Sequence, residues 1–398
     1  MPKPYRIALV TSGRADYGLL KPLWLALEAD AEFSPSMIAT GSHLVAEQGN
    51  TLDFLKNEGI TPLYTVDMKI SGDSAAALGA ASGLGLACFA EFFERHDFDL
   101  LVILGDRVEM LAVATAALLN RLPIAHIHGG EATFGMLDDA VRHSLTKLSA
   151  LHFVAHPVYA RRVIQMGEAP QRVFTVGAIG LDNVTQIPRL SVSELSQRTG
   201  MDWSKPTILL TYHPVTLNAP SLAYAEMQTV LAAALASDLQ ILVTMPNIDA
   251  GGGQIYQAII EGQRAAAEQL HFVKSLGQQG YLSAMQHCAL LLGNSSSGII
   301  EAASFKKPVV NIGERQLGRL AAKNVCHVTC DTQQILNAIN QVSSVDFQQS
   351  LADLQNPYGQ GESAAKILVE LKKINLDDRN GLLKKGFDDL PAPTEQAE

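Results

Sequence analysis

The sequence predicts an α/β protein of two Rossmann-like domains, each built on a doubly wound parallel sheet. Three observations support this fold class. The chain has 398 residues, more than one growing hydrophobic core normally accommodates. Short apolar runs alternate with helical patterns in two separate series, as expected of βαβ units. A polar segment rich in turn-forming residues, at about residues 181–190, separates the two series.

The first series contains six apolar runs that predict strands buried on both faces. These runs are RIALVTS (6–12), SMIATG (36–41), LLVILG (100–105), PIAHIHG (123–129), LHFVAH (151–156) and FTVGAIG (174–180). Helical spacing appears between them in LLKPLWLALEAD (19–30), LVAEQGNTLDFLKNEG (44–59), AALGAASGLGLACFAEFFERH (76–96) and VEMLAVATAALLN (108–120). Because helices separate successive strands, the strands should run parallel.

The second series has six further apolar runs with helical patterns between them. The runs are TILLTYH (207–213), LQILVTMP (239–246), LHFVKS (270–275), ALLLGNSS (289–296), PVVNIG (308–313) and NVCHVTC (324–330). We therefore place the first domain at 1–182 and the second at 183–356, with a helix at 357–376 that closes the fold. The polar tail, 377–398, is expected to be mobile. Two such halves with a central cleft are typical of the glycosyltransferase-B architecture.

Composition narrows the classes of function. The chain is 47% hydrophobic and 18% charged, which suits two cores. A net charge of −10 argues against nucleic-acid binding, which needs an excess of Lys and Arg. Four cysteines without paired spacing indicate reduced thiols in a cytoplasmic protein. The runs LLVILG and CALLLGN are far shorter than the ~20 residues of a membrane span, and no signal peptide is recognisable, so no membrane partner is expected.

Polar loops follow six of the predicted strands. They are TSGRADYG (11–18), GDR (105–107), HGGE (128–131), YHPVT (212–216), PNIDAGG (246–252) and GNSSSG (293–298). In open α/β sheets ligands bind at the carboxyl ends of the strands. The densest group of titratable residues runs from Asp106 to Lys147, and it indicates chemistry on a polar substrate.

Carboxylates in this stretch are candidates for acid–base chemistry. Asp106, Glu131 and the pair Asp138–Asp139 are close in sequence, and clustered carboxylates separate one another's pKa values into a base and an acid. The alternative is that Asp106 caps a helix and that Asp139 lies on a solvated helix face. We adopt a solvated role for Arg142, which is spaced i, i+4 from Asp138. Glu131 follows two glycines in a tight loop and fits that alternative least.

Other polar loops carry candidate anion-binding groups. The serines of GNSSSG at a predicted helix start could cradle a phosphate; the alternative is that one serine simply caps the helix. Arg14 could grip a diphosphate or form a surface salt bridge. His213 could donate to a phosphate or leaving group, or be a structural histidine. His126 and His128 are strand-spaced but lack a third clear ligand, so we expect no metal site.

Taken together and in order, these motifs resemble the hydrolysing UDP-N-acetylglucosamine 2-epimerases of sialic-acid and legionaminic-acid biosynthesis. The motifs are GRADYG, GDR, HIHGGE, DD-x-x-RH-x-x-TK, HPVT, PNIDAG, GNSSSGIIE and GERQLGR, over nearly the whole chain. The resemblance implies no metal or redox cofactor, with the nucleotide held mainly by the second domain. It implies catalytic roles for Asp106, Glu131, Asp138 and His213. It implies a UDP-binding set of Arg14, Gly18, Arg107, His213, Asn247, Ser295, Ser296, Glu301 and Arg315.

The family's reaction fits these residue types. A base removes the C2 proton and UDP leaves anti to it, which gives a 2-acetamidoglucal that is then hydrated to a free manno sugar. Which carboxylate takes the first proton is left open. Alternative readings are a UDP-N,N′-diacetylbacillosamine 2-epimerase, a glycosyltransferase of the same architecture and an inactive UDP-sugar sensor. We expect no kinase activity, and family analogy predicts a homodimer or homotetramer.

Overall fold

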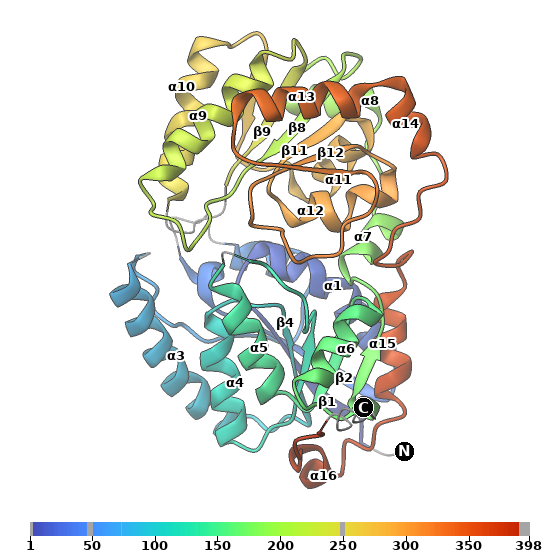
Figure 1. Ribbon diagram of the computed structural model, residues 1–398. Helices are drawn as coiled ribbons and strands as arrows, with labels where there is room; N and C mark the ends of the chain where they lie inside the picture. Colours follow the sequence, from blue (N-terminus) through green and yellow to red (C-terminus); the bar gives the residue numbers. More distant parts are fainter. Residues whose placement is uncertain (1–2, 46–50, 73, 135, 247–250, 390–398) are drawn as a thin grey trace, which may run out of the picture. The chain divides into compact units, whose positions relative to one another are not determined.

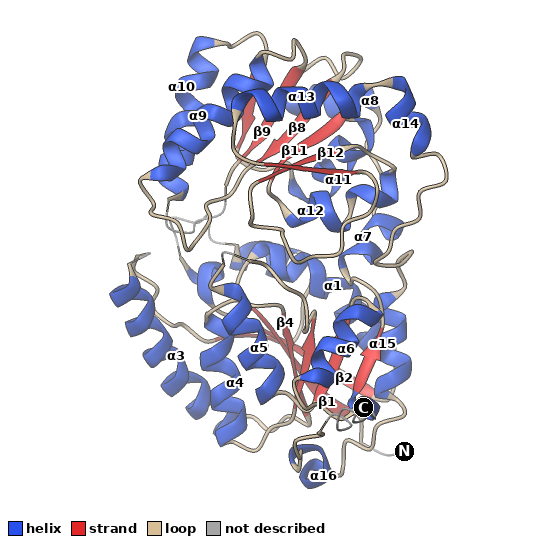
Figure 2. Ribbon diagram, viewed as in Figure 1, coloured by secondary structure: helices blue, strands red, loops and turns tan. Residues whose placement is uncertain are grey.

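The computed structural model describes residues 3–45, 51–72, 74–134, 136–246 and 251–389. The chain forms two compact units, and it crosses between them more than once. Unit 1 consists of Met1–Glu131, Ala140–Ile179 and Glu362–Glu398, and unit 2 of Ala132–Asp139 and Gly180–Gly361. Each unit contains one parallel sheet with helices on both faces (Figures 1 and 2).

The sheet of unit 1 has seven parallel strands in the order β3-β2-β1-β4-β5-β6-β7. They are β1 (Tyr5–Thr11), β2 (Phe33–Ala39), β3 (Leu63–Thr65), β4 (Leu100–Leu104), β5 (Ile124–Ile127), β6 (Leu151–Val154) and β7 (Val173–Thr175). In register, Ile7 of β1 faces Pro35 on one side and Leu100 on the other. The strand order reverses between β1 and β4, which is where open α/β sheets bind ligands.

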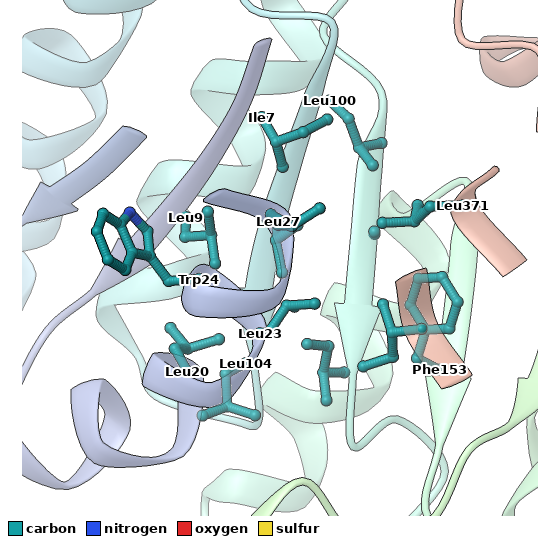
Figure 3. Packing of buried hydrophobic residues seen from close by; sticks show 14 of the residues in the cluster. Ile7, Leu9, Leu20, Leu23, Trp24, Leu27, Leu100, Leu104, Phe153 and Leu371 are labelled. Carbon is teal, nitrogen blue, oxygen red and sulfur yellow. The ribbon is translucent and has the colours of Figure 1, made fainter. Parts of the chain in front are cut away.

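Helices cover both faces of this sheet. On one face, α1 and α15 pack through apolar residues at helical spacing, and Leu23 and Leu27 of α1 share a buried cluster with Leu9 and Leu371 (Figure 3). On the other face, α3, α4 and α5 pack on the sheet. The helices of unit 1 are α1 (Arg14–Glu28), α2 (Leu52–Asn57), α3 (Ala75–Arg95), α4 (Glu109–Leu119), α5 (Asp138–Leu148), α6 (Pro157–Gln165), α15 (Ser363–Leu371) and α16 (Arg379–Leu383), with short 3-10 helices η1 (Gly41–Leu44) and η3 (Pro170–Arg172). The first two residues of α5, Asp138 and Asp139, belong to unit 2.

Unit 2 repeats the plan with six parallel strands in the order β10-β9-β8-β11-β12-β13. The strands are β8 (Thr207–Thr211), β9 (Gln240–Thr244), β10 (Leu270–Val273), β11 (Leu290–Gly293), β12 (Val309–Ile312) and β13 (Val325–Val328). One face packs against α9, α10 and α13, and the other against α8 and α11. The helices are α7 (Gly180–Gln186), α8 (Val192–Thr199), α9 (Leu222–Leu235), α10 (Gly252–Ala265), α11 (Gly277–His287), α12 (Ser296–Ile300), α13 (Thr332–Ser343) and α14 (Val345–Ser350), with η4 (Ala302–Phe305).

Each apolar run that predicts a strand contains one, but some boundaries differ from the expectation. The strand expected at 174–180 ends at Thr175, and the helix expected at 44–59 covers only Leu52–Asn57 among its described residues. The three-residue strand β3 has too few residues to show a pattern. The linker expected at about 181–190 largely forms helix α7, and its Leu181 and Asp182 are buried. Turn-forming residues there are tolerated because tertiary packing outweighs local propensity.

The prediction of a mobile tail is wrong for residues 377–389, which we call the C-terminal segment. Within unit 1 this segment forms α16, buries Leu382 in the core and is held by side chains from distant parts of the sequence. Arg172 donates to the carbonyls of Leu382 at 2.6 Å and Gly381 at 2.8 Å, and Arg379 donates to that of Phe98 at 2.6 Å. Such partners cannot be read from a polar composition.

Helix α3 is long and apolar enough to cross a membrane by length and composition, although only 22% of that stretch is buried. The short runs LLVILG and CALLLGN, considered in the sequence, do not include this helix. Its inner side, with Phe89 and Phe93, belongs to the core of unit 1. One helix of this kind is weak evidence for a membrane span.

Candidate active site

Glu131 lies in unit 1 at the end of a tight loop that follows β5. Gly130 has φ +77, and a Cβ there would lie 2.5 Å from the Tyr159 carbonyl oxygen, so only glycine fits beside the following acid. Glu131 is 1% exposed, and its Oε1 lies 2.5 Å from Nδ1 of His128. The amide N–H of Ile179 donates to Nε2 of the same ring at 3.3 Å. Nε2 therefore carries no proton, and a neutral His128 donates from Nδ1 to the carboxylate.

Asp106 lies after β4 and is held by Arg142 from α5. The Nε of Arg142 donates to Oδ2 of Asp106 at 3.1 Å, and Nη2 donates to the same oxygen. The Nη1 of Arg142 donates to the Glu131 carbonyl at 3.0 Å. One guanidinium thus connects both candidate catalytic loops of unit 1 through charge-assisted hydrogen bonds.

The solvated role expected for Arg142 is wrong. Its side chain is 1% exposed and forms an ion pair with Asp106. An i, i+4 spacing makes a surface pair available, but it cannot show that the helix face points inward. Asp139 is not simply solvated either, because its Oδ1 accepts the Thr133 amide at 2.7 Å and the Thr133 hydroxyl at 3.1 Å.

His126 has a different partner from His128. In β5 its side chain is completely buried. Burial lowers the pKa of His126 to about 3, so the ring is neutral at physiological pH. Nε2 lies 2.7 Å from the Gly105 carbonyl and Nδ1 3.2 Å from the Thr146 hydroxyl, so the ring supports the turn that precedes Asp106.

A third group of polar residues surrounds the end of β1, and the motif analysis missed most of it. Asp16 accepts the Ser12 hydroxyl at 2.7 Å and lies 3.9 Å from Nε of Arg107. The Ser42 hydroxyl donates to the Ser12 carbonyl at 2.7 Å. His43 is fully buried, and burial lowers its pKa to about 4.

These missed residues follow the rule that drew attention to the other loops. The tripeptide Gly41–Ser42–His43 begins one residue after β2, so it lies at a carboxyl strand end. Arg14 and Gly18, both expected to bind UDP, lie in the first turns of α1. The Arg14 guanidinium is exposed and sits 5.5 Å from the centre of the Phe54 ring.

In unit 2, Asn294 joins several of the expected nucleotide-binding residues. It is completely buried at the end of β11. Its Oδ1 accepts the His213 amide at 2.7 Å, and its Nδ2 donates to the His213 carbonyl at 2.8 Å. Its carbonyl accepts from Nη1 of Arg315 at 3.1 Å and from Nε2 of Gln316 at 2.9 Å. Gly293 permits this approach, because a Cβ there would lie 2.0 Å from the Thr211 carbonyl oxygen.

The serine loop next to Asn294 forms a hydroxyl network. Ser295 caps α12, and its hydroxyl lies 3.0 Å from that of Ser297. The Tyr281 hydroxyl lies 2.7 Å from Ser297 and 3.4 Å from Thr211, whose own hydroxyl is 2.7 Å from that of Thr244. Thr211, Tyr281, Ser295 and Ser297 line a small hollow at the ends of β8 and β11.

The sequence predicts that a helix start here cradles a phosphate, and the structure differs from that prediction in the length of the helix. Helix α12 has only five residues, Ser296–Ile300, and Glu301 is its C-cap. So short a helix contributes little dipole, and an anion at this loop would meet mainly its hydroxyls and amides. Asn247 lies outside the described residues. Asp138 begins α5.

Among the described residues, no group of three or more His, Cys, Asp or Glu side chains is placed to hold a metal ion. The four cysteines are free thiols. What the structure presents is two separate sets of groups. Unit 1 carries carboxylates that are oriented by a histidine and an arginine. Unit 2 carries hydroxyl, amide and guanidinium donors around Asn294.

Comparison with known proteins supports the same reading. The family described as UDP-N-acetylglucosamine 2-epimerase matches residues 25–372. The chain belongs to this family. It is 35% identical over 387 residues, 97% of this chain and 99% of the relative, to a protein from Campylobacter jejuni named GDP/UDP-N,N′-diacetylbacillosamine 2-epimerase (hydrolyzing). It is 36% identical over 371 residues, 93% of this chain and 96% of the relative, to a Legionella pneumophila UDP-N,N′-diacetylbacillosamine 2-epimerase (hydrolyzing).

A solved structure shows the same fold. The UDP-GlcNAc 2-epimerase from Neisseria meningitidis, bound to UDP-GlcNAc, matches with a TM-score of 0.79 at 17% identity, covering 93% of this chain and 100% of that chain. The predicted fold class, two Rossmann-like domains of glycosyltransferase-B type, is confirmed, as are the family resemblance and the prediction of an enzyme. The individual site residues stay predictions.

Proposed function

We propose that this protein is a hydrolysing 2-epimerase that converts a UDP-2-acetamido sugar and water into UDP and a free manno-configured sugar. The observation that carries the proposal is the pair of oriented carboxylates in unit 1. Glu131 is fixed by His128 and Asp106 by Arg142, and Arg142 also binds the Glu131 backbone. The two relatives described above carry names that specify the hydrolysing reaction.

The first step is an elimination, in which a carboxylate takes the C2 proton and the C1–O bond breaks. The electron pair of the C2–H bond forms the C1=C2 double bond, and UDP leaves as the diphosphate anion. A C2 proton is weakly acidic, so the base must be pre-positioned. Glu131 and Asp106 meet that need, and Asp138 is the third proposed member of the proton-transfer set.

The departing diphosphate needs positive or dipolar partners. We assign this role to Arg14, Arg107 and Arg315, to His213, and to the hydroxyl network of Ser295. Ser296, Gly18, Asn247 and Glu301 complete the proposed UDP-binding set, with Glu301 toward a ribose hydroxyl. The structure supports the role of unit 2 because Asn294 ties His213 and Arg315 to the serine loop.

The second step hydrates the glycal. A water oxygen bonds to C1 and gives up a proton to a carboxylate, and C2 receives a proton on the face opposite to the one that lost it. The sum is UDP-sugar plus water giving UDP plus the free C2-inverted sugar, with no oxidant and no cofactor consumed. The same carboxylates serve as base and acid in turn because each can carry one proton.

Between the two candidate sugars, we place UDP-N,N′-diacetylbacillosamine first and UDP-N-acetylglucosamine second. The reason is the naming of the Campylobacter and Legionella relatives, which cover nearly the whole chain. UDP-N-acetylglucosamine remains the second candidate substrate because the matching family is named after it. We further propose that the enzyme works in the cytoplasm, where nucleotide sugars and free thiols coexist, and that it is a homodimer or homotetramer.

The experiment compares both UDP-sugars in deuterated water and follows UDP release and the free sugar by NMR. The expected product has the manno configuration and deuterium at C2. A gluco product that keeps its C2 proton would mean simple hydrolysis and would overturn the epimerase proposal. UDP release that depends on an added acceptor would indicate a glycosyltransferase, and binding without turnover would indicate a UDP-sugar sensor.

A further inference from the structure

Lys385 of the C-terminal segment closes the last turn of helix α5. Its Nζ donates to the carbonyls of Lys147 at 2.8 Å and Ser149 at 2.7 Å, and lies 3.4 Å from that of Thr146. These oxygens belong to the end of the helix, where carbonyls lack intrahelical partners. A cation at that end also complements the helix dipole. A segment more than 200 residues away in sequence therefore caps the helix that carries Arg142.

The same ammonium also binds a buried carboxylate. Glu168 is 1% exposed and lies 2.7 Å from Lys385, 2.6 Å from Lys147 and 2.9 Å from Nε2 of His152. Burial would raise the pKa of Glu168, but the hydrogen bonds from His152, Lys147 and Lys385 outweigh it and lower the pKa to about 2. The aromatic ring of Phe387 lies 5.0 Å from Nζ of Lys147. The C-terminal segment is thus attached through an ion pair to a buried carboxylate, which is costly to leave unpaired.

We call the contacts of Lys385 with the end of α5 and with Glu168 the clamp. From this clamp, hydrogen bonds lead to the candidate catalytic residues. The Thr146 hydroxyl lies 3.1 Å from the Arg142 carbonyl and 3.2 Å from Nδ1 of His126. The other ring nitrogen of His126 lies 2.7 Å from the carbonyl of Gly105, the residue before Asp106. Each link has a partner at hydrogen-bond distance, and Thr146, His126 and Arg142 are buried.

The second branch runs along α5 itself. Arg142 lies one turn before Thr146 and binds the Asp106 carboxylate and the Glu131 carbonyl. An axial shift or fraying of α5 would move both contacts together. Catalytic groups lose much of their effect when displaced by about 1 Å, so a displacement at the far end of α5 would reach the chemistry.

We propose that Lys385 is a positioning residue of the active site, which acts by clamping α5 and, through Thr146, His126 and Arg142, by holding Asp106 and Glu131 in place. The catalytic part of this inference rests on the proposed function, whereas its structural part does not. The C-terminal segment is then a component of the active-site scaffold. Lys385 itself touches no substrate.

The test compares Lys385→Met with Lys384→Met, a neighbouring lysine that is exposed and serves as the matched control. Hydrogen exchange by mass spectrometry is measured on peptides that cover α5 and the 124–131 region, and steady-state kinetics are measured well below the melting temperature. We expect faster exchange in both peptides for Lys385→Met only, a kcat about 10- to 100-fold lower and a KM within about twofold. Lys385→Arg should recover most of the kcat because it keeps the charge.

Unchanged exchange in α5, or an unchanged kcat in the folded variant, would overturn the proposal. If exchange becomes faster in Lys385→Met but the wild-type protein turns over neither sugar, the proposed function is wrong. The contact between Lys385 and α5 would then still hold. A merely structural clamp would lower the melting temperature while leaving kcat unaltered. If Lys385→Met does not fold, Lys385→Gln, which keeps a donor to the carbonyls, takes its place in the same comparison.

Discussion

At the scale of single residues, buried partners decide what each candidate side chain can do. Arg142 is the strongest case, because it binds two loops from one position on α5. His128 is another, since the Ile179 amide fixes its tautomer and so aims Nδ1–H at Glu131. Both residues are positioned by groups that are distant in sequence. Their substitution therefore tests the geometry of the site.

Arg142→Lys should lower kcat by at least about 10-fold and leave the KM for the UDP-sugar nearly unchanged. Lysine keeps the charge but cannot bind Asp106 and the Glu131 carbonyl at the same time with a fixed fork. Steady-state kinetics of the folded variant check this. The exposed Arg161, converted to Lys in the same way, is the control and should behave as wild type. Equal kcat values for the two variants would show that the bridging geometry is unimportant.

Glu131→Gln and Asp106→Asn should each lower kcat by about 1,000-fold or more, while UDP still binds. Each change keeps the shape of the side chain but removes a proton acceptor. Calorimetry with UDP and the NMR assay give the two readouts. Supplying 2-acetamidoglucal separates the steps, because a variant that hydrates it but cannot form it has lost the first base. If both variants turn over normally, the assignment of these carboxylates is wrong.

At the scale of elements, the outer side of α3 combines glycines with open surroundings. A Cβ at Gly79 or Gly83 would meet no atom within 4 Å, whereas one at Gly85 would lie 2.5 Å from Cε of Met68. Glycine inside a helix costs about 1 kcal/mol relative to alanine, chiefly through backbone entropy. No close contact with a described residue of this chain therefore offsets the cost of glycine at Gly83.

Gly83→Ala should raise the free energy of unfolding of unit 1 by about 0.5–1 kcal/mol. Gly85→Ala should gain less or lose stability, because the new methyl group must displace the Met68 side chain. Urea unfolding followed by circular dichroism compares the two directly. A Gly83→Ala protein that is less stable than Gly85→Ala would contradict this view of the helix.

At the scale of the whole molecule, buried histidines make folding sensitive to acid, and they are unevenly distributed. Burial lowers the pKa of His43 to about 4 and that of His126 to about 3, and both lie in unit 1. Their ordinary pKa is 6.5. Between these values the unfolded chain binds protons that the folded chain does not, so stability falls as the pH falls. Glu168 adds to the loss only below about pH 4.5, its ordinary value.

Unit 1 should lose about 1 kcal/mol of stability per histidine for each pH unit between about pH 6 and pH 5. Each unit contains one tryptophan, Trp24 in unit 1 and Trp203 in unit 2, so the fluorescence of Trp203→Phe reports unit 1 alone. Urea midpoints at pH 7, 6 and 5 measure the slope. The His43→Gln variant should reduce that slope by the contribution of one histidine. A midpoint that does not move between pH 7 and 5 would show that these histidines titrate normally.

The sequence by itself determined the features that rest on local periodicity. Apolar runs and helical spacing identified both sheets, and polar loops at strand ends pointed to Asp106, Glu131, His213 and Ser295. The ordered motifs identified the family. These features are readable because strand and helix periods, and the carboxyl-end rule, depend on neighbours in sequence.

Only the tertiary structure decided which of these groups work together. Arg142 turned from an expected surface residue into the buried partner of Asp106, and Asn294 became the centre of the donors in unit 2. The C-terminal segment turned from an expected mobile tail into the clamp on α5. In each case the deciding contact joins residues that are 20 or more positions apart, where burial and hydrogen-bond satisfaction override local pattern.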